Sequence, residues 1–577
     1  MSGEEHEKKP ARRQFVTRSR LGCSNCKDRR IRCDEKRPQC SNCVNMAKAC
    51  SYGPAKVPLR DRRAQLRSSD QTPWIVQNSS PESWPNVTTQ VTETRERRSA
   101  PWKWIELERM NTFEAFPIVM PLRSKELLYY FRQVGESFTV PSEQQPEQQP
   151  RQRLDDCMSS AVQDPFTLRN MLLIAGIHYA WNLGDLQTFE PTFLSHKIKA
   201  IRLVNEGLNT LSDEEDYLSC ANYIITLSFT EASTSICGSC CLGNFRVAEA
   251  HLKGLMRFID AHRPDEESSS SQDAIKRELT DRYLILAYNF VHSLKSRLDD
   301  FLASTAIIEN ISRDSDPKGL ARVLHRWHVQ EATGLAFRLK TIRLFPYFFS
   351  SAIVTKYPRH VDVSDIISCL AQITKQHDAR FAGFEAAYDA RSRYELWDSG
   401  GPSRLLSAVV NAHLDSISNE PPLSSHSNVG FASSWSGFCV AIGMYLTSVL
   451  GVWNQGSPAE SSLLQHVLLI LKQDLETSWL NFKARSKESR ALWIWKWFAG
   501  ALTIAHVQPK DCDRRFRELS VEFLSLVEHC RGVIRKGSEH WPEVKAMLHR
   551  VVWPHELPKE LEVIKFWNNP ILGSLSP

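Results

Sequence analysis

Apolar residues recur with helical spacing through most of the chain after about residue 123. Leu168, Leu172, Ala175 and Tyr179 follow one another at intervals of three or four residues, which places them on one face of a helix. Similar stripes occupy six further segments: Lys125–Glu136, His196–Leu208, Val247–Phe258, Leu279–Leu298, Ala321–Leu344 and Arg515–His529. Alternating strand patterns are hard to find. The pattern predicts an all-α body over residues 123–577, built as one large domain.

Two apolar runs in the body require a choice between core packing and another role. Gly437–Trp453 is near the lower length limit for a membrane span and contains small and hydroxylated residues, so we expect a buried helix. Trp493, Trp495 and Trp497, followed by Phe498, could line a ligand pocket, but packing of a helix into the core is the favoured interpretation. We therefore expect no contact with a membrane.

The segment 55–122 differs in texture from the body. It is rich in Ser, Thr, Pro and Arg and has little apolar periodicity, which predicts a linker that is largely disordered. Within it, Val57–Arg67 holds only Leu59 and Leu66 before Pro73 ends any helix. Sustained heptad spacing is missing, so this segment is not expected to form a coiled coil.

The region before this linker is dominated by cysteine. Six cysteines follow the spacing Cys-x2-Cys-x6-Cys-x6-Cys-x2-Cys-x6-Cys, at Cys23, Cys26, Cys33, Cys40, Cys43 and Cys50. Four thiolates close a tetrahedral zinc site, so six suffice for two zinc ions only if two sulfurs bridge. The symmetric arrangement has Cys23 and Cys40 as the bridging sulfurs. Cys26 and Cys33 then complete one site, and Cys43 and Cys50 complete the other.

A disulfide knot and a purely structural metal site fit the cysteine-rich region less well. The first ten residues are polar and charged, with no sign of a secretory signal peptide, so we expect a reducing compartment in which disulfides are disfavoured. A purely structural metal site is disfavoured by the basic run Lys27–Arg32 inside the cluster. Cys237, Cys240 and Cys241 form a further group, but three thiols are too few for a closed tetrahedral site.

The charge is unevenly distributed. The whole chain carries a net +6, whereas residues 1–70 hold 18 Lys and Arg against 8 Asp and Glu, a net +10. The remaining residues are therefore mildly acidic. A basic head on such a body is typical of a protein whose head alone contacts a polyanion.

With these residues in view, the stretch from Arg20 to Tyr52 resembles the fungal binuclear zinc-cluster transcription factors. The resemblance is carried by the run Cys26–Glu35 and by Arg37–Cys40, which includes Pro38. It implies a domain over residues 18–54: a helix–loop–helix pair around two zinc ions, with its first helix in the major groove at a CGG-like triplet. The body resembles, more loosely, the fungal-specific α-helical regulatory domain.

The resemblance also implies roles for the basic residues of the head. Arg29 and Arg30 match the positions that read bases. Phosphate contacts are expected from four others: Lys27, Arg32, Arg18 and Arg20. Arginine suits both tasks, because it can reach guanine O6 and N7 and can neutralise phosphate.

Together these observations predict a mostly α-helical, zinc-dependent, DNA-binding regulator that acts in the nucleus. The resemblance implies that it regulates RNA polymerase II transcription of pathway genes, with a metabolic or secondary-metabolite gene cluster as one candidate target. Its partners would be double-stranded DNA and the transcription machinery; without a coiled coil, it binds as a monomer or as a homodimer formed through the body. No Gly-rich phosphate loop, Gly-x-Ser-x-Gly elbow or His-Glu-x-x-His motif is evident, so we expect no enzyme. The alternatives are a nuclear scaffold that uses the zinc cluster for protein contacts, and an enzyme with an appended nucleic-acid-binding head.

Overall fold

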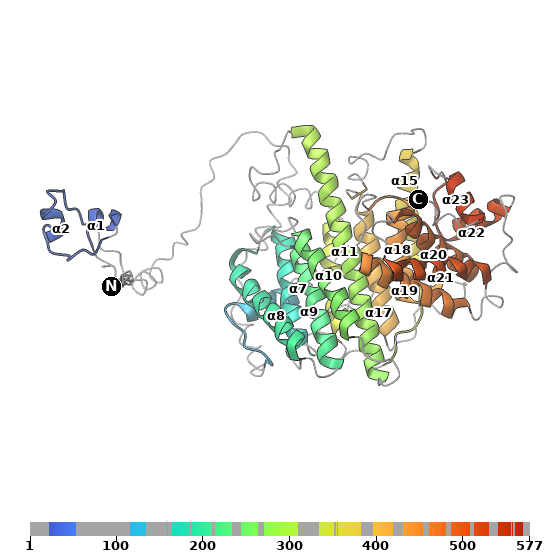
Figure 1. The fold of residues 1–577 in the computed structure, drawn as a ribbon, viewed down its shortest axis with the longest axis horizontal. Coiled ribbons are helices and arrows are strands. Elements are labelled where there is room, and N and C mark those ends of the chain that lie inside the picture. The colour runs from blue at the N-terminus through green and yellow to red at the C-terminus, as the bar shows by residue number, and fades with distance from the viewer. Residues whose placement is uncertain are drawn as a thin grey trace, which may run out of the picture. The chain divides into compact units, whose positions relative to one another are not determined.

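A computed structural model gives the fold of the chain, which divides into two compact units, Met1–Leu107 and Glu108–Pro577 (Figure 1). In the first unit the structure describes residues 22–29 and 31–52. In the second it describes residues 116–133, 159, 164–184, 186–210, 214–233, 244–262, 271–309, 334–350, 354, 356–381, 396–397, 399–418, 431–453, 461–479, 486–507, 513–529, 540–555, 557 and 560–568.

The second unit, the body, is built from helices. The described ones are α5 (Ser124–Gln133), α7 (Pro165–Leu183), η3 (Gln187–Phe189), α8 (Glu190–Thr210), α9 (Glu214–Ser233), α10 (Phe245–His262), α11 (Ser271–Glu309), α13 (Gly334–Ile342), α14 (Pro346–Phe349), α15 (Ser364–Phe381), α17 (Gly401–Ile417), α18 (Trp435–Met444), the π-helical turn η6 (Tyr445–Val449), α19 (Ser461–Trp479), α20 (Lys487–His506), α21 (Arg514–His529), α22 (Trp541–Val551) and α23 (Glu560–Asn568). Two strands of two residues each, β1 (Val361–Asp362) and β2 (Ala432–Ser433), pair antiparallel.

The mostly α-helical fold is confirmed. Each apolar stripe of the sequence falls on a helix wherever its residues are described; for example, Val247–Phe258 lies within α10 and Arg515–His529 within α21. The first part of the stripe expected at 321–344 lies outside the described residues; its described part is α13 followed by a turn at Arg343 and Leu344. The short β1–β2 pair is too brief to give an alternating pattern, so it left no signal in the sequence.

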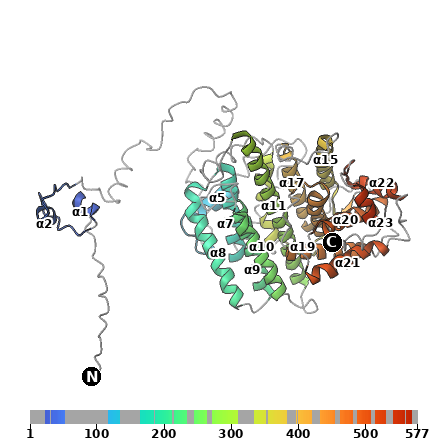
Figure 2. The same ribbon diagram turned by 45° about the horizontal axis from the view of Figure 1, so that its top comes forward.

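One continuous hydrophobic core runs through the body, from Leu127 in α5 to Trp567 in α23. Figures 1 and 2 both show α7, α8, α9 and α10 side by side at one end and α19 to α22 at the other. Between them runs α11, whose 39 residues span about 58 Å at ~1.5 Å per residue. This long helix packs against α9 and α10 on one side and against α18 on the other, which joins the two groups.

Helix α7 is buried on almost every side. It begins at an Asp164 cap, whose carboxylate accepts from the backbone N–H groups of Phe166 and Thr167, and it ends at Gly184 in the left-handed conformation. The stripe expected from the sequence is buried, but so is nearly every other side chain from Thr167 to Asn182. A helix that is apolar all round belongs inside a large core, and α7 is such a helix.

The two ambiguous apolar runs both lie in this core. Every residue of α18 is buried, and the helix continues into η6, so the run expected at 437–453 is helical up to Val449; Leu450–Trp453 follow the helix and are also buried. In α20 the side chains of Trp495, Trp497 and Phe498 have no exposed surface. Among the described residues, no helix is long and apolar enough to cross a membrane.

The body includes residues that the sequence assigns to the linker. Phe116, Ile118 and Met120 pack against the core ahead of α5. The Arg123 N–H donates to Thr192 Oγ1 at 3.2 Å, which ties the end of this segment to α8. The packed structure therefore extends to Phe116, before the boundary expected at residue 123.

A buried ion pair joins α19 and α20. Lys496 Nζ lies 2.7 Å from Asp474 Oδ2, and the two side chains are only 4% and 6% exposed. The same ammonium donates to Ser433 Oγ at 2.6 Å. A Cβ atom on Gly437 would lie 2.3 Å from Asp474 Cγ, so glycine is what allows α18 to approach the pair.

We expect Lys496→Met to lower the free energy of unfolding by about 3–5 kcal/mol, because it leaves the Asp474 carboxylate buried without its cation. Arg514→Met is the matched control: it breaks a pair with Glu518 in which the side chains are 87% and 58% exposed, and should cost less than about 1 kcal/mol. Urea unfolding of both variants measures the difference. Equal losses would show that burial of the Lys496–Asp474 pair does not govern its contribution.

Candidate metal centre and nucleic-acid interface

The first unit contains the head, residues 18–54, whose described part has two one-turn helices, each beginning directly after a cysteine. Helix α1 (Ser24–Asp28) has Cys23 at its N-cap, and α2 (Ser41–Val44) has Cys40 there. The Cys-x2-Cys spacing places the second cysteine of each pair in the first helical turn, on the side of the capping sulfur. In α1 this is direct: Cys23 Sγ accepts from the Cys26 N–H at 3.4 Å.

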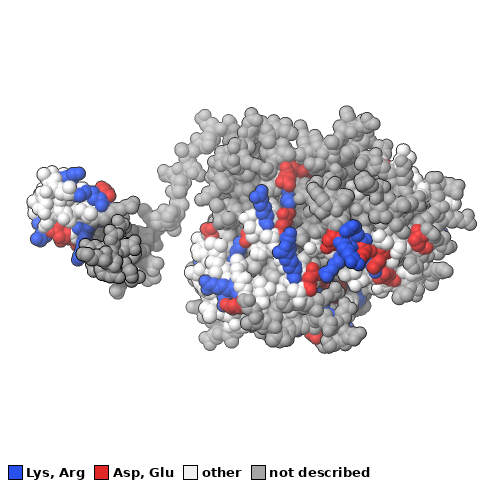
Figure 3. Space-filling view, viewed as in Figure 1, with Lys and Arg blue, Asp and Glu red and all other residues white. Residues whose placement is uncertain are grey.

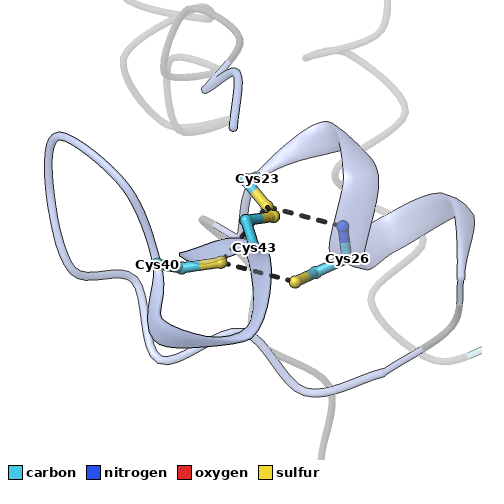
Figure 4. Close-up of side chains that lie close together, drawn as sticks. All are labelled: Cys23, Cys26, Cys40 and Cys43. Carbon is cyan, nitrogen blue, oxygen red and sulfur yellow. Dashed lines mark hydrogen bonds between the residues drawn. The ribbon is translucent and has the colours of Figure 1, made fainter. Parts of the chain in front are cut away.

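The two pairs meet, so that four sulfurs face one another (Figure 4). The sulfur atoms of Cys23, Cys26, Cys40 and Cys43 all lie within 4.8 Å of one another. Three of the Sγ–Sγ distances are 3.7 Å (Cys23–Cys40), 3.6 Å (Cys23–Cys43) and 3.6 Å (Cys26–Cys40). A zinc–sulfur bond of about 2.3 Å in a tetrahedron implies an edge of about 3.8 Å, whereas a disulfide would bring two sulfurs to about 2.05 Å. The spacing fits thiolates around metal, and all six cysteines are free of disulfides.

The remaining two cysteines occupy equivalent places in the two halves. Cys33 Sγ accepts from the Cys23 N–H at 3.5 Å, and Cys50 Sγ accepts from the Cys40 N–H at 3.4 Å. Cys33 also lies in a second group of close ligand atoms with Cys40 and Asp34. The sequence repeat is thus a structural repeat, in which Cys23 and Cys40 each contact sulfurs of both halves.

The close contacts among the sulfurs shift the pKa values of the thiols in opposite directions. Burial raises the pKa of Cys23, but hydrogen bonds from Cys26, Cys43 and Cys40 outweigh it and bring the pKa to about 6. Burial, together with hydrogen bonds to Cys23 and Cys40, raises the pKa of Cys26 to about 12. Burial is also the largest cause of the raised pKa of Cys43. Adjacent thiolates repel, so the set cannot be fully ionised on its own, and a divalent cation among the sulfurs removes the conflict.

The head is closed by contacts between its two ends. The Ser24 N–H donates to the Ser51 carbonyl at 2.8 Å, which returns the chain to the start of α1. Tyr52 donates to the Lys36 carbonyl at 2.7 Å, and the Arg37 guanidinium lies 5.2 Å from the centre of its ring. These contacts place the Tyr52 hydroxyl 3.8 Å from Cys33 Sγ.

The structural roles of two residues in the head, Tyr52 and Asp34, were not predicted from the sequence. The Asp34 carboxylate accepts from the Ser41 hydroxyl at 2.6 Å and from the Ser41 N–H at 3.2 Å, so it caps α2. The Ser41 hydroxyl is the main cause that lowers the pKa of Asp34. The sequence did hold a signal for this cap: Asp34 lies seven residues before Ser41, the first residue of α2 after Cys40. No comparable signal marked Tyr52.

The described basic residues of the head are on its surface. Lys27, Arg29 and Arg32 are all exposed, and Figure 3 shows Lys and Arg side chains on the outside of the head. The Arg29 guanidinium Nη1 lies 2.6 Å from Met46 Sδ, just beyond α2. The backbone at Arg32 is fixed because its carbonyl accepts from Asn42 Nδ2 at 2.8 Å.

Several expected residues lie outside the described part of the chain. Among the expected DNA contacts these are Arg18, Arg20 and Arg30; the same holds for Val57–Arg67 and for the cysteine group at 237–241.

Comparison with known families supports the interpretation of the head as a zinc-cluster domain. Residues 21–57 match the fungal Zn(2)-Cys(6) binuclear cluster domain, so this part of the chain is a domain of that family, which implies two zinc ions.

Relatives match mainly over short stretches. Sterol uptake control protein 2 of Saccharomyces cerevisiae is 46% identical over 52 residues, which is 9% of this chain and 6% of the relative. Transcription factor lfc1 of Flammulina velutipes is 29% identical over 142 residues, 23% of this chain and 49% of the relative. The aspercryptin biosynthesis cluster-specific transcription regulator atnN of Emericella nidulans is 31% identical over 91 residues, which is 14% of this chain and 15% of the relative. The chain thus spans less than half the length of each of these relatives, and no solved structure matches it.

We expect the purified full chain to contain two zinc ions. Cys23→Ser should reduce the content to below one, because Cys23 contacts sulfurs of both halves, whereas Cys50→Ser should leave about one. Cys369→Ser, a change of a half-buried cysteine in α15, is the control and should leave two. Elemental analysis after gel filtration measures the content. A greater loss from Cys50→Ser than from Cys23→Ser would contradict the bridging arrangement.

Proposed function

We propose that the chain is a zinc-dependent, sequence-specific DNA-binding regulator of transcription. The observation that carries this proposal is the position of α1. A sulfur cluster fixes the start of the helix, and exposed basic side chains occupy its end and the residues that follow it. An element held in this way can present arginines to a groove of DNA without its own hydrophobic core.

Within this proposal the six cysteines hold both zinc ions, with Cys23 and Cys40 as the shared ligands. The close sulfur distances and the repeated N–H to Sγ contacts support the assignment. A set made only of thiolates leaves no open position for substrate, so the metal has a structural task. Zinc binding then supplies the folding free energy of the head, and DNA binding depends on it.

The basic residues divide into two roles. Arg29 and Arg30 read a CGG-like triplet, while Lys27, Arg32, Arg18 and Arg20 contact phosphate. The exposure of Lys27, Arg29 and Arg32 supports these roles. In the free head the Arg29 guanidinium rests against Met46, so base reading by Arg29 requires it to leave that contact. The Met46 contact holds the side chain beside the helix until DNA is bound.

The body serves as the regulatory domain in this proposal, joined by the linker to a head at residues 18–54. The names of lfc1 and atnN, a transcription factor and a cluster-specific transcription regulator, support a role in transcription and an action on a set of pathway genes. Regulation of RNA polymerase II transcription in the nucleus is part of the same proposal. The sequence of the body has no recognisable catalytic motif, which is consistent with a regulatory rather than an enzymatic task. Contacts with the transcription machinery, and any homodimer, would then be made by the body.

One observation favours the second candidate, a nuclear scaffold that uses the cluster for protein contacts. The head exposes three large apolar side chains, Ile31, Val44 and Met46, at 39%, 56% and 48% of their surface. Exposed apolar side chains of this kind, where they form one patch, mark protein-contact surfaces. The two candidates differ in one requirement: only the DNA-binding regulator needs Arg29 and Arg30 for its partner.

We expect the full chain to select a CGG-like triplet from random duplexes, and we expect Arg29→Ala/Arg30→Ala to abolish the selection. Each contact of an arginine with guanine is worth about 1–3 kcal/mol of discrimination. Lys36→Ala/Lys48→Ala removes the same charge from other exposed positions of the head and should keep the triplet with weaker overall affinity. Arg18→Ala should mainly lower the salt dependence, by a slope of about 1.

A chelator should abolish binding by the wild-type chain. If the Lys36/Lys48 variant lost the triplet as fully as the Arg29/Arg30 variant, the role assignment would be wrong. If no duplex were enriched by the zinc-loaded chain, the scaffold would be the better account.

A further inference from the structure

A groove opens on the body beside the start of α7 and the outer face of α8, far in sequence from the head. Its volume is about 560 Å³. The segment from Pro117 to Pro121 forms one wall, α8 from Ser195 to Leu203 forms the other, and Tyr223 of α9 also lines it. Grooves that bind small molecules have volumes of this order, roughly 300–1,000 Å³.

The walls of the groove leave apolar surface uncovered. Val119 is 86% exposed and Ile198 is 50% exposed, and they lie on opposite walls. Ile118 and Pro165 add further apolar surface. An apolar part of a ligand would therefore find contacts on both sides.

His196 contributes a buried hydrogen-bond acceptor. The Ser124 hydroxyl donates its hydrogen to the Pro121 carbonyl, so its contact of 2.8 Å with His196 Nε2 requires that Nε2 carry the hydrogen. Nδ1 is then the unprotonated nitrogen. It is buried, in a side chain that is 1% exposed, and it has no hydrogen-bond partner among the described residues. Burial, followed by the charge of Arg169, lowers the pKa of His196 to about 4, so the ring stays neutral at physiological pH.

Cationic residues line the groove together with His196. Arg169 lines the groove; its side chain is hydrogen-bonded to the Tyr223 hydroxyl, while its Nε–H is buried without an acceptor among the described residues. Lys199 and Arg202, exposed on α8, line the groove as well. Its described lining contains no Asp or Glu. The nearby Asp164 is engaged as the cap of α7. An unpartnered donor on Arg169, an unpartnered acceptor on His196 and two exposed cations therefore belong to residues that line the same groove.

We propose that this groove binds a small organic acid with an apolar chain and a hydroxyl group close to its carboxylate. The carboxylate pairs with Arg169 and with the cations of α8. The hydroxyl donates to His196 Nδ1, and the chain lies between Val119 and Ile198. This site goes beyond DNA binding and does not depend on it, because every residue involved belongs to the body.

The probe is 3-hydroxydodecanoate, titrated into the zinc-loaded full chain below its micellar concentration and followed by calorimetry. We expect one saturable site. Dodecanoate, which lacks the hydroxyl, should bind about 5–10-fold more weakly, because a buried acceptor is then left without a partner. The neutral 1,3-dodecanediol should bind more weakly still, since it cannot pair with the cations.

Three variants test the assignment of residues. Lys199→Ala/Arg202→Ala, at exposed positions where folding is not at risk, should weaken both acids by about 10-fold. His196→Gln keeps a donor for Ser124 but loses the acceptor at the Nδ1 position, so 3-hydroxydodecanoate should bind no better than dodecanoate. Lys253→Ala/Arg257→Ala removes the same charge from exposed positions on α10 and should change nothing.

Equal affinity of all three compounds, or equal weakening by the α8 and α10 variants, would mean nonspecific adsorption and would overturn the proposal. A photo-crosslinker placed at Ile198 gives a further test. If it joined the groove to another segment of this chain, and no acid bound, the proposal would also be overturned.

Discussion

The crowding of thiol sulfurs in the head is the constraint on which the rest of its structure depends. The buried apolar side chains of the described head are five cysteines, with Cys50 and Tyr52 packed beside them. A segment this small has no hydrocarbon core to offset the entropy of ordering its chain. The same sulfurs drive one another's pKa values apart, to about 6 for Cys23 and about 12 for Cys26. Metal resolves both problems, because it neutralises the thiolates and supplies binding free energy that only the folded head can use.

The body is stabilised by different forces. Its core is continuous and made of aliphatic and aromatic side chains, so its folding does not require metal. Charges inside it are paired, as Lys496 is with Asp474, or lie over aromatic rings, as the Arg282 guanidinium lies 5.4 Å from the Trp435 ring. Arg169 and His196, which line the groove, are among the buried residues with a side-chain nitrogen that has no hydrogen-bond partner among the described residues. Loss of zinc should therefore disable the head while the body stays folded and able to bind its ligand.

Much of this organisation could be predicted from the sequence. The cysteine spacing is a local signal, and because each Cys-x2-Cys pair begins a helix, the spacing alone brought the sulfurs of a pair together. Helical periodicity placed α8, α10 and α21, since each presents one apolar face to the core. Features made by residues distant in the sequence left no such trace. The contact of Arg29 with Met46 depends on how α1 and α2 pack. The groove joins the segment before α5, which looked like linker, to α7, α8 and α9.

X-ray absorption at the zinc edge of the purified full chain tests the central claim most directly. We expect a first shell of sulfur alone, four atoms per zinc at about 2.3 Å, together with scattering from a second zinc nearby. Nitrogen or oxygen in that shell, or zinc ions without a metal neighbour, would contradict the shared-sulfur cluster and with it the physical basis of the head.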